Sequence, residues 1–271
     1  MSNADLRGRF VWHELATTDT AGAGAFYPKV VSWKTQPWEH DASYTLLMGG
    51  SGPTGGVMGL GEDQSSAPRW IAYVGTPDIS ATVEAAKKLG ATVVKDVADV
   101  ANAGKYAVLK DPQGAEFAVY TPAPGSSSSN AGPVVGEFSW HELATKDFEA
   151  ALRFYQQLFG WEKGPTHDMG GGMTYHLFPH AGQDVGGNFN GDSVGMSPAW
   201  MCYVRVDDVS KAANAVKAAG GRVLNGPMEV PGGDWVAQVM DPQGATFPVH
   251  EKKSAGAAAK PGRPAEPPAP K

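Results

Sequence analysis

The sequence lacks the features that mark several large classes of protein. It has one cysteine, Cys202, in 271 residues, which excludes a disulfide framework within the chain and fits a reducing compartment. No apolar run approaches the roughly 20 residues of a membrane span, and no apolar stretch of signal-peptide type stands near the N-terminus. Lys and Arg number 22 against 28 Asp and Glu, so no basic footprint for nucleic acid or anionic membrane is present. We therefore expect a cytoplasmic protein with small-molecule partners, and neither nucleic acid nor membrane.

The chain contains two sequence segments that each occur twice. Residues 12–17 read WHELAT and return unchanged at 140–145, 128 positions later. Residues 111–120 return at 241–250, 130 positions later, with seven of ten positions identical and DPQGA in common. Two phrases kept in order at nearly one spacing indicate a duplicated domain.

The duplication sets the domain organisation. We expect a first domain at 8–122, a Pro/Gly/Ser linker at 123–135, a second domain at 136–251 and a disordered Ala/Pro/Lys tail at 252–271. Because a short linker gives the two units a high effective concentration for each other, we expect them to pack as an intrachain pseudo-dimer. The whole molecule is then expected to be a monomer or a weak homodimer.

Each unit shows the same order of predicted elements. A strand at 10–17 precedes a helix that Asp19 caps, and the second copy has the same strand and a helix that begins after Asp147 and ends at Gly160. A second helix begins after Asp78 in the first unit and runs over about 209–219 in the second. Short strands separate the helices, and DPQG reads as a tight turn before the last strand. The pattern predicts an α+β fold in which each unit is two βαβββ modules.

These elements resemble the vicinal oxygen chelate superfamily, which includes glyoxalase I, bleomycin-resistance proteins and extradiol dioxygenases. The resemblance rests on the strand, the Asp-capped helix with its Phe-Tyr pair, the phrase FGW at 159–161, and the D-P-x-G turn. It covers about 10–120 and 138–250. It implies two tandem glyoxalase-like domains, each with curled mixed sheets around a cleft and helices outside.

Metal-dependent members of that superfamily hold a divalent ion with His, Gln or Glu on the concave sheet faces. The resemblance implies that the corresponding positions here are Trp12, Trp70 and Ala118 in the first unit, Trp140, Trp200 and Pro248 in the second, and a further one near Met58 or Asn188. An indole has no usable lone pair, so none of these positions offers a strong ligand. We therefore expect no catalytic metal and no cofactor.

Strand alternation selects the candidate site residues. It places Glu14 on the same face as Trp12, and Glu142 on the same face as Trp140, while His13 and His141 point to the opposite face, toward the helices. The candidate acid–base groups are Glu14, Glu142 and His250, and the candidate ligand-binding residues are Trp12, Trp70, Glu116, Tyr120, Trp140, Trp200 and Cys202. Indoles around a carboxylate suit a planar or cationic organic ligand, and partial desolvation raises the pKa of such a carboxylate.

Each of these residues also has a structural interpretation. The tryptophans can be core, the glutamates can form ion pairs, Cys202 can be a small buried residue, and the repeated histidines can be hydrogen-bonded within the core.

Four functions remain open at this point. Our main hypothesis is a metal-independent protein that binds a small organic ligand in Trp-lined clefts, as the drug-sequestering resistance proteins do. The second is an enzyme of lyase, isomerase or dioxygenase type that uses Glu14 or Glu142 as acid–base groups on a carbonyl or aromatic substrate. The third is a metal-dependent enzyme whose ligands are displaced in our alignment, and the fourth is a two-domain structural or regulatory module.

Overall fold

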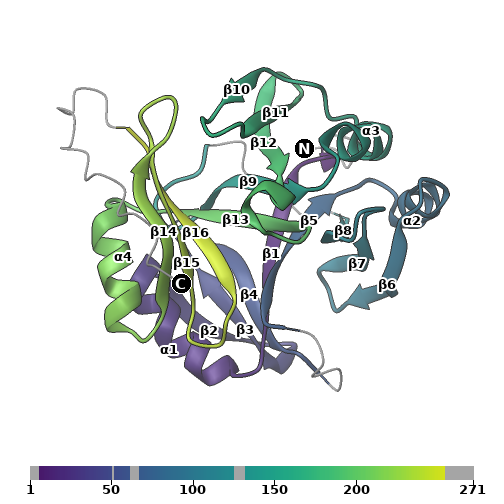
Figure 1. Ribbon diagram of the computed structural model, residues 1–271. Helices are drawn as coiled ribbons and strands as arrows, with labels where there is room; N and C mark the ends of the chain where they lie inside the picture. Colours follow the sequence, from purple (N-terminus) through teal and green to yellow (C-terminus); the bar gives the residue numbers. More distant parts are fainter. Residues whose placement is uncertain (1–5, 51, 62–66, 125–131, 254–271) are drawn as a thin grey trace.

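The computed structural model describes residues 6–50, 52–61, 67–124 and 132–253, which form two sheets of eight strands with four α-helices (Figure 1). The first unit contains β1 (Phe10–Thr17), α1 (Thr20–Val31), β2 (Lys34–Trp38), β3 (Asp41–Met48), β4 (Pro53–Gly59), β5 (Arg69–Gly75), α2 (Ile79–Lys88), β6 (Thr92–Val100), β7 (Gly104–Lys110) and β8 (Glu116–Pro122). The second contains β9 (Phe138–Thr145), α3 (Phe148–Phe159), β10 (Thr166–Asp168), β11 (Thr174–His180), β12 (Gln183–Asn190), the 3₁₀ turn η2 (Gly191–Val194), β13 (Ala199–Arg205), α4 (Val209–Ala218), β14 (Arg222–Glu229), β15 (Trp235–Met240) and β16 (Thr246–Glu251).

The two sheets have the same topology. The strand order is β2-β3-β4-β1-β5-β8-β7-β6 in the first and β10-β11-β12-β9-β13-β16-β15-β14 in the second. In each sheet the repeated WHELAT strand is central: β1 runs parallel to β4 and antiparallel to β5, and β9 does the same with β12 and β13. The predicted α+β fold with tandem βαβββ modules is therefore confirmed. The short edge strands β2 and β10 were not predicted.

All four helices begin after an aspartate. The side chains of Asp19, Asp78, Asp147 and Asp208 each accept a hydrogen bond from a backbone N–H in the first turn, as expected of an N-cap. None of the helices in the described ranges has the length and apolar character needed to cross a bilayer.

The two units contact each other through pairs of helices and through the strands β5, β8, β13 and β16. Figure 1 shows α1 beside α4, and α3 near α2 on the other side of the molecule. Phe26 of α1 meets Phe247 of the second unit edge-on, and Phe154 of α3 meets Phe117 of the first unit in the same way. The Phe-Tyr helix of each unit thus contributes to a core that both units share.

The DPQG turns hold this interface from both sides. The hydroxyl of Tyr27 donates to Oδ2 of Asp241 at 2.9 Å, and the hydroxyl of Tyr155 donates to Oδ2 of Asp111 at 3.1 Å. Oδ1 of each aspartate accepts backbone N–H bonds from its own turn. Burial raises the pKa of both carboxyls. The turn predicted from DPQG is present, and its aspartate also joins the two units.

Candidate functional site

A carboxylate with two tyrosine hydroxyls lies on the face of each sheet that points away from the helices. In the first unit, Oε2 of Glu14 accepts from Tyr73 at 2.7 Å and makes a longer contact of 3.5 Å with Tyr44. The indole N–H of Trp12 donates to the Tyr44 hydroxyl at 3.0 Å. Trp12 and Glu14 come from alternate positions of β1, Tyr44 from β3 and Tyr73 from β5, so three strands assemble the group.

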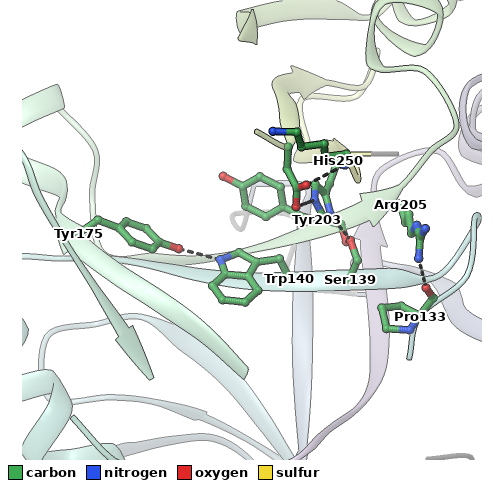
Figure 2. Close-up of polar contacts among 9 residues, drawn as sticks. Pro133, Ser139, Trp140, Tyr175, Tyr203, Arg205 and His250 are labelled. Atoms are coloured by element: carbon green, nitrogen blue, oxygen red, sulfur yellow. Dashed lines mark hydrogen bonds and ion pairs between the residues drawn. The ribbon is translucent and has the colours of Figure 1, made fainter. Parts of the chain in front are cut away.

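The second unit repeats this group. Oε2 of Glu142 accepts a short hydrogen bond from Tyr203, and the indole N–H of Trp140 donates to the hydroxyl of Tyr175 at 2.7 Å. Figure 2 shows Trp140 pointing toward Tyr175, with the Tyr203 ring above Trp140 in this view. Glycine makes room for one of the tyrosines, because a Cβ on Gly187 would overlap the ring of Tyr175.

Burial changes the proton affinity of both carboxylates. Burial raises the pKa of Glu142 to about 7, and the hydrogen bond from Tyr203 opposes that rise. Burial also raises the pKa of Glu14, against the hydrogen bond from Tyr73 and the charge of Lys95. In the described residues, the partners of both carboxylates are tyrosine hydroxyls rather than Arg or Lys in an ion pair. Glu142 is thus poised to exchange a proton near neutral pH.

A cavity of about 770 Å³ opens over Glu142 in the second unit. Its wall is largely apolar and contains five methionines, whose flexible thioethers adapt to irregular ligands. The polar groups that reach it include Glu142, Tyr175, Tyr203, Asp234 and His250. The methionines are Met169, Met173, Met196, Met201 and Met228. The volume falls within the usual range for small-molecule sites.

Two positions of the cavity wall correspond to larger side chains in the first unit. Tyr106 stands where the second unit has Val236, and Tyr120 where it has His250. The amino group of Lys95 lies 4.7 Å from the centre of the Tyr106 ring and takes part in packing there. At the first of these two positions the second unit therefore carries the smaller side chain, valine in place of tyrosine.

His250 lies in the cavity wall with both ring nitrogens engaged. Nδ1 is 2.9 Å from Oγ of Ser139, and Nε2 is 2.9 Å from Oδ2 of Asp234. Figure 2 shows the His250 ring between Tyr203 and Ser139. The candidate acid–base group proposed from the sequence thus borders the cavity, although a ligand must displace one of these partners to reach a ring nitrogen.

The structure corrects the placement of three candidate ligand-binding residues. Trp70 and Trp200 lie in the helix-side core, where their indoles donate to Tyr27 and Tyr155 at 3.0 Å, so their assignment to the clefts is wrong. Cys202 is buried in the same core. The reason is register: each Trp faces a leucine of the central strand, and directly opposed residues share a face.

The other candidate residues lie in different environments: one is in an ion pair, one packs beside the cleft, and one is buried on the helix side. Glu116 forms a close ion pair with Arg69, with a shortest distance of 2.7 Å, so its carboxylate is neutralised. The hydroxyl of Tyr120 donates to the backbone carbonyl of Ala103 at 2.5 Å. Its ring packs against a hydrophobic cluster that includes Tyr73 and Ala118. Asn188 is fully buried opposite Leu143 on the helix side, so it cannot serve as a cleft ligand.

The tyrosines of the site are absent from the candidates named above. Tyr73 and Tyr203 each stand three residues after a repeated Trp, and Tyr44 and Tyr175 each lie in the strand before the glycine pairs 55–56 and 186–187. Both pairs recur at nearly the spacing of the repeat, and that signal was sufficient to find them.

Two family models match the chain, one in each unit. Residues 12–120 match the glyoxalase-like domain, and residues 137–249 match the Glyoxalase/Bleomycin resistance protein/Dioxygenase superfamily. The chain belongs to this superfamily. The superfamily resemblance inferred from the sequence, in a tandem form, is therefore confirmed.

Curated relatives match nearly the whole length. The chain is 28% identical over 247 residues to a Mycobacterium bovis protein named "Putative glyoxylase CFP32", covering 88% of this chain and 92% of the relative. It is also 28% identical over 268 residues to the anthracycline biosynthesis protein DauV of Streptomyces sp. (strain C5), covering 93% and 96%. The Mn(II)-bound glyoxalase from Novosphingobium aromaticivorans has the same fold, with a TM-score of 0.61, 17% identity and coverage of 91% and 82%.

The cleft residues of this superfamily member do not fit a divalent metal ion. Trp12 and Trp140 stand at expected ligand positions, and their indole N–H groups already donate to tyrosines. Within the described ranges, one group of three His, Cys, Asp or Glu is close enough to share an ion, and it lies on the helix side of the sheets. The expected absence of a catalytic metal from the clefts stays a prediction.

Glu142→Gln is expected to stabilise the protein at alkaline pH. The folded chain keeps a proton on Glu142 up to about pH 7, whereas the ordinary value is 4.5, so the folded state binds more protons than the unfolded state in this window. Wild-type stability then falls as pH rises through the window, and glutamine removes that fall. Melting curves should show the variant above wild type at about pH 8 and level with it at about pH 4. Glu84→Gln, at an exposed ion pair with Lys87, is the control; parallel pH curves for wild type and Glu142→Gln would contradict the prediction.

Proposed function

We propose that this superfamily member binds a small, largely apolar organic ligand in the cavity of its second unit, with Glu142 as the polar centre. The observation that carries the proposal is a single raised-pKa carboxylate in a methionine-rich cavity of about 770 Å³. Apolar walls supply most of the binding free energy, and a few convergent polar groups fix the orientation of the ligand.

The chemistry of the cavity favours an aromatic ligand that carries an amine or another hydrogen-bond donor. Trp140, Tyr175 and Tyr203 offer ring faces and edges, and methionine sulfur packs well against aromatic rings. An ionised Glu142 would pair with an ammonium group in a site partly shielded from water. The relatives DauV and DnrV are named anthracycline biosynthesis proteins, and polycyclic aromatic amines are therefore the first class to test.

One observation favours a second candidate function, proton transfer to or from a bound substrate. A carboxyl group with a pKa of about 7 is well matched to general acid–base catalysis at neutral pH. The mycobacterial relative's name includes the word glyoxylase, and extradiol dioxygenases share the fold. In this alternative, Glu142 removes a proton from a carbon next to a carbonyl group, and the Tyr203 hydroxyl stabilises the carboxylate.

Glu142→Gln is expected to weaken the binding of aromatic amines by about tenfold to 100-fold, because a charge-assisted contact in a shielded site contributes on the order of 1.5–3 kcal/mol. The measurement is quenching of tryptophan fluorescence, supported by calorimetry, across a panel of aromatic amines and their neutral analogues. The matched control is Glu14→Gln, at the equivalent carboxylate of the first unit. Equal affinities for wild type and Glu142→Gln would rule out Glu142 as the polar centre.

Exchange of a ligand proton with solvent distinguishes the two candidate functions, proton transfer and binding alone. Ligands that bind are incubated in D₂O with catalytic amounts of protein, and proton NMR follows loss of the signal next to the carbonyl group. An enzyme exchanges that proton faster as pH rises through about 7, and Glu142→Gln abolishes the exchange. A pure binder shows no exchange at any pH.

A further inference from the structure

Two histidines from the repeated WHELAT strands meet between the two units. Nε2 of His13 and Nε2 of His141 are 2.7 Å apart, and both side chains are buried. Each ring is held by a phenylalanine of the other unit: His141 stacks on Phe10 at 3.5 Å, and His13 stacks on Phe138 at 3.6 Å. The pair lies on the helix side of both sheets, opposite the clefts, and the binding site described above does not use it.

The backbone contacts of the two rings fix where their lone pairs point. His13 hydrogen-bonds the backbone of Thr54 and His141 that of Val185, and each bond acts to raise the pKa of its ring. A bond that favours the protonated ring is one in which the ring donates and a carbonyl accepts. Since Nε2 of each ring faces the other ring, Nδ1 is the donor. A neutral ring with its proton on Nδ1 has its lone pair on Nε2.

With Nδ1 donating in both rings, the two Nε2 lone pairs face each other at 2.7 Å, and an ion between the rings would bind both nitrogens. Neutral imidazole is the form that binds metal ions.

A thiol completes the group. Cys202 lies directly across the strand pair from His141, and its Sγ and the two histidines have ligand atoms within 4.8 Å of one another. The corresponding residue of the first unit, directly across from His13, is Ala72. The group thus has two imidazoles and one thiol. A second thiol would be present only if cysteine replaced Ala72.

We propose that His13, His141 and Cys202 bind one thiophilic metal ion, Zn²⁺ or Cu⁺, between the two units. Two neutral imidazoles and a thiolate are a donor set that both ions accept. Metal–nitrogen bonds of about 2.0–2.1 Å place the two nitrogens farther apart than they are now, so the rings separate slightly when the ion enters. The Cys202 thiol gives up its proton to solvent as the metal–sulfur bond forms, with one proton released for each ion and no change of oxidation state.

Such an ion would tie the first unit to the second. Its ligands come from β1, β9 and β13, the central strands of both sheets, so binding requires the folded interface. An ion that binds only the folded, docked state stabilises that state by mass action.

The test uses the full chain, produced without a histidine tag. The first arm of the test titrates divalent ions: Co²⁺ is the spectroscopic probe, and Zn²⁺ is added to compete with it. The second arm titrates Cu⁺ under anaerobic, reducing conditions, in competition with a chelator. We expect one equivalent to bind in at least one arm, with a thiolate-to-metal charge-transfer band and release of one proton. Failure to bind in both arms would overturn the proposal.

Variants at the two corresponding positions make the test specific. Cys202→Ala gives the second unit the residue that the first unit has at position 72. The variant is expected to lose the charge-transfer band and to bind the metal ion at least about 100-fold more weakly. A loss of that size exceeds what a residue that only supports a metal ligand contributes. Ala72→Cys supplies the second thiol and is expected to bind divalent ions at least about tenfold more tightly, as a four-ligand site. His40→Gln, a partly exposed histidine beside Glu39, should bind as wild type does. Circular dichroism confirms folding of each variant, and Cys202→Ala with wild-type affinity would overturn the proposal.

Discussion

Replacing Asp241 with alanine is expected to lower the melting temperature by about 10 °C. The substitution removes the acceptor of the buried Tyr27 hydroxyl, which itself accepts from Trp70. It also removes the acceptor of three backbone N–H groups in the DPQG turn. Each buried polar group left without a partner costs on the order of 1–3 kcal/mol, so we expect a total of about 3–5 kcal/mol. A chain of this size loses roughly 2–4 °C for each kcal/mol.

Scanning calorimetry of a small set of variants tests this. Asp111→Ala, at the equivalent turn of the first unit, should lose a similar amount, because Tyr155 depends on it in the same way. Tyr27→Phe removes the hydroxyl and leaves the turn bonds, so its loss should be smaller. A double-mutant cycle of Tyr27→Phe with Asp241→Ala isolates the contact between the units. If Asp241→Ala melts within about 2 °C of wild type, the DPQG aspartate has no such role.

Replacing Gly186 with alanine is expected to disrupt the second unit almost as strongly. A Cβ at this position would overlap the backbone carbonyl oxygen of His141 in the neighbouring strand. A backbone carbonyl cannot change rotamer to avoid the clash, as a side chain can. The strand β12 must therefore shift relative to β9, which lowers the free energy of unfolding by about 3 kcal/mol. The same shift moves Phe189 and Glu142 at the cavity, and ligand binding should fall together with stability.

A glycine in a helix provides the control for that substitution. Gly24 lies inside α1, and a Cβ there would have its nearest neighbour, a Thr35 methyl group, at 3.9 Å. Gly24→Ala should therefore be neutral or stabilise the protein by up to about 1 kcal/mol, because alanine favours the helix. Thermal melts and fluorescence titrations of both variants make the comparison. Unchanged stability and binding in Gly186→Ala would show that the strand pair tolerates a side chain.

Much of the fold could be predicted because its signals are local. Aspartate N-caps begin the helices, and glycine in the left-handed conformation ends α3 at Gly160, so those boundaries appear in the sequence. The edge strands β2 and β10 were missed because their residues are almost all exposed and show no apolar alternation. Edge strands form by pairing with a neighbour, which a single sequence does not display.

The site was predicted only in part, because register is not local. Trp12, Glu14, Trp140 and Glu142 were placed together correctly by alternation within one strand. Trp70 and Trp200 were placed on the wrong face because that assignment required knowing which residue of the neighbouring strand each one opposes.

The openness of the second cavity could not be predicted from one strand either. Its lining comes from several strands and loops, including Val236 where the first unit has Tyr106, and the sequence does not show that these segments surround one space.

The difference between Cys202 and Ala72, which stand at corresponding positions of the two units, has a consequence for how this protein can evolve. A homodimer encoded by one gene must carry the same residue on both sides of its axis, so a codon change there always appears twice. Fusion of the two copies removes that restriction, since each half can drift by itself. A single thiol beside two equivalent histidines is an arrangement that an unfused homodimer could not encode, and only the tandem gene could inherit it.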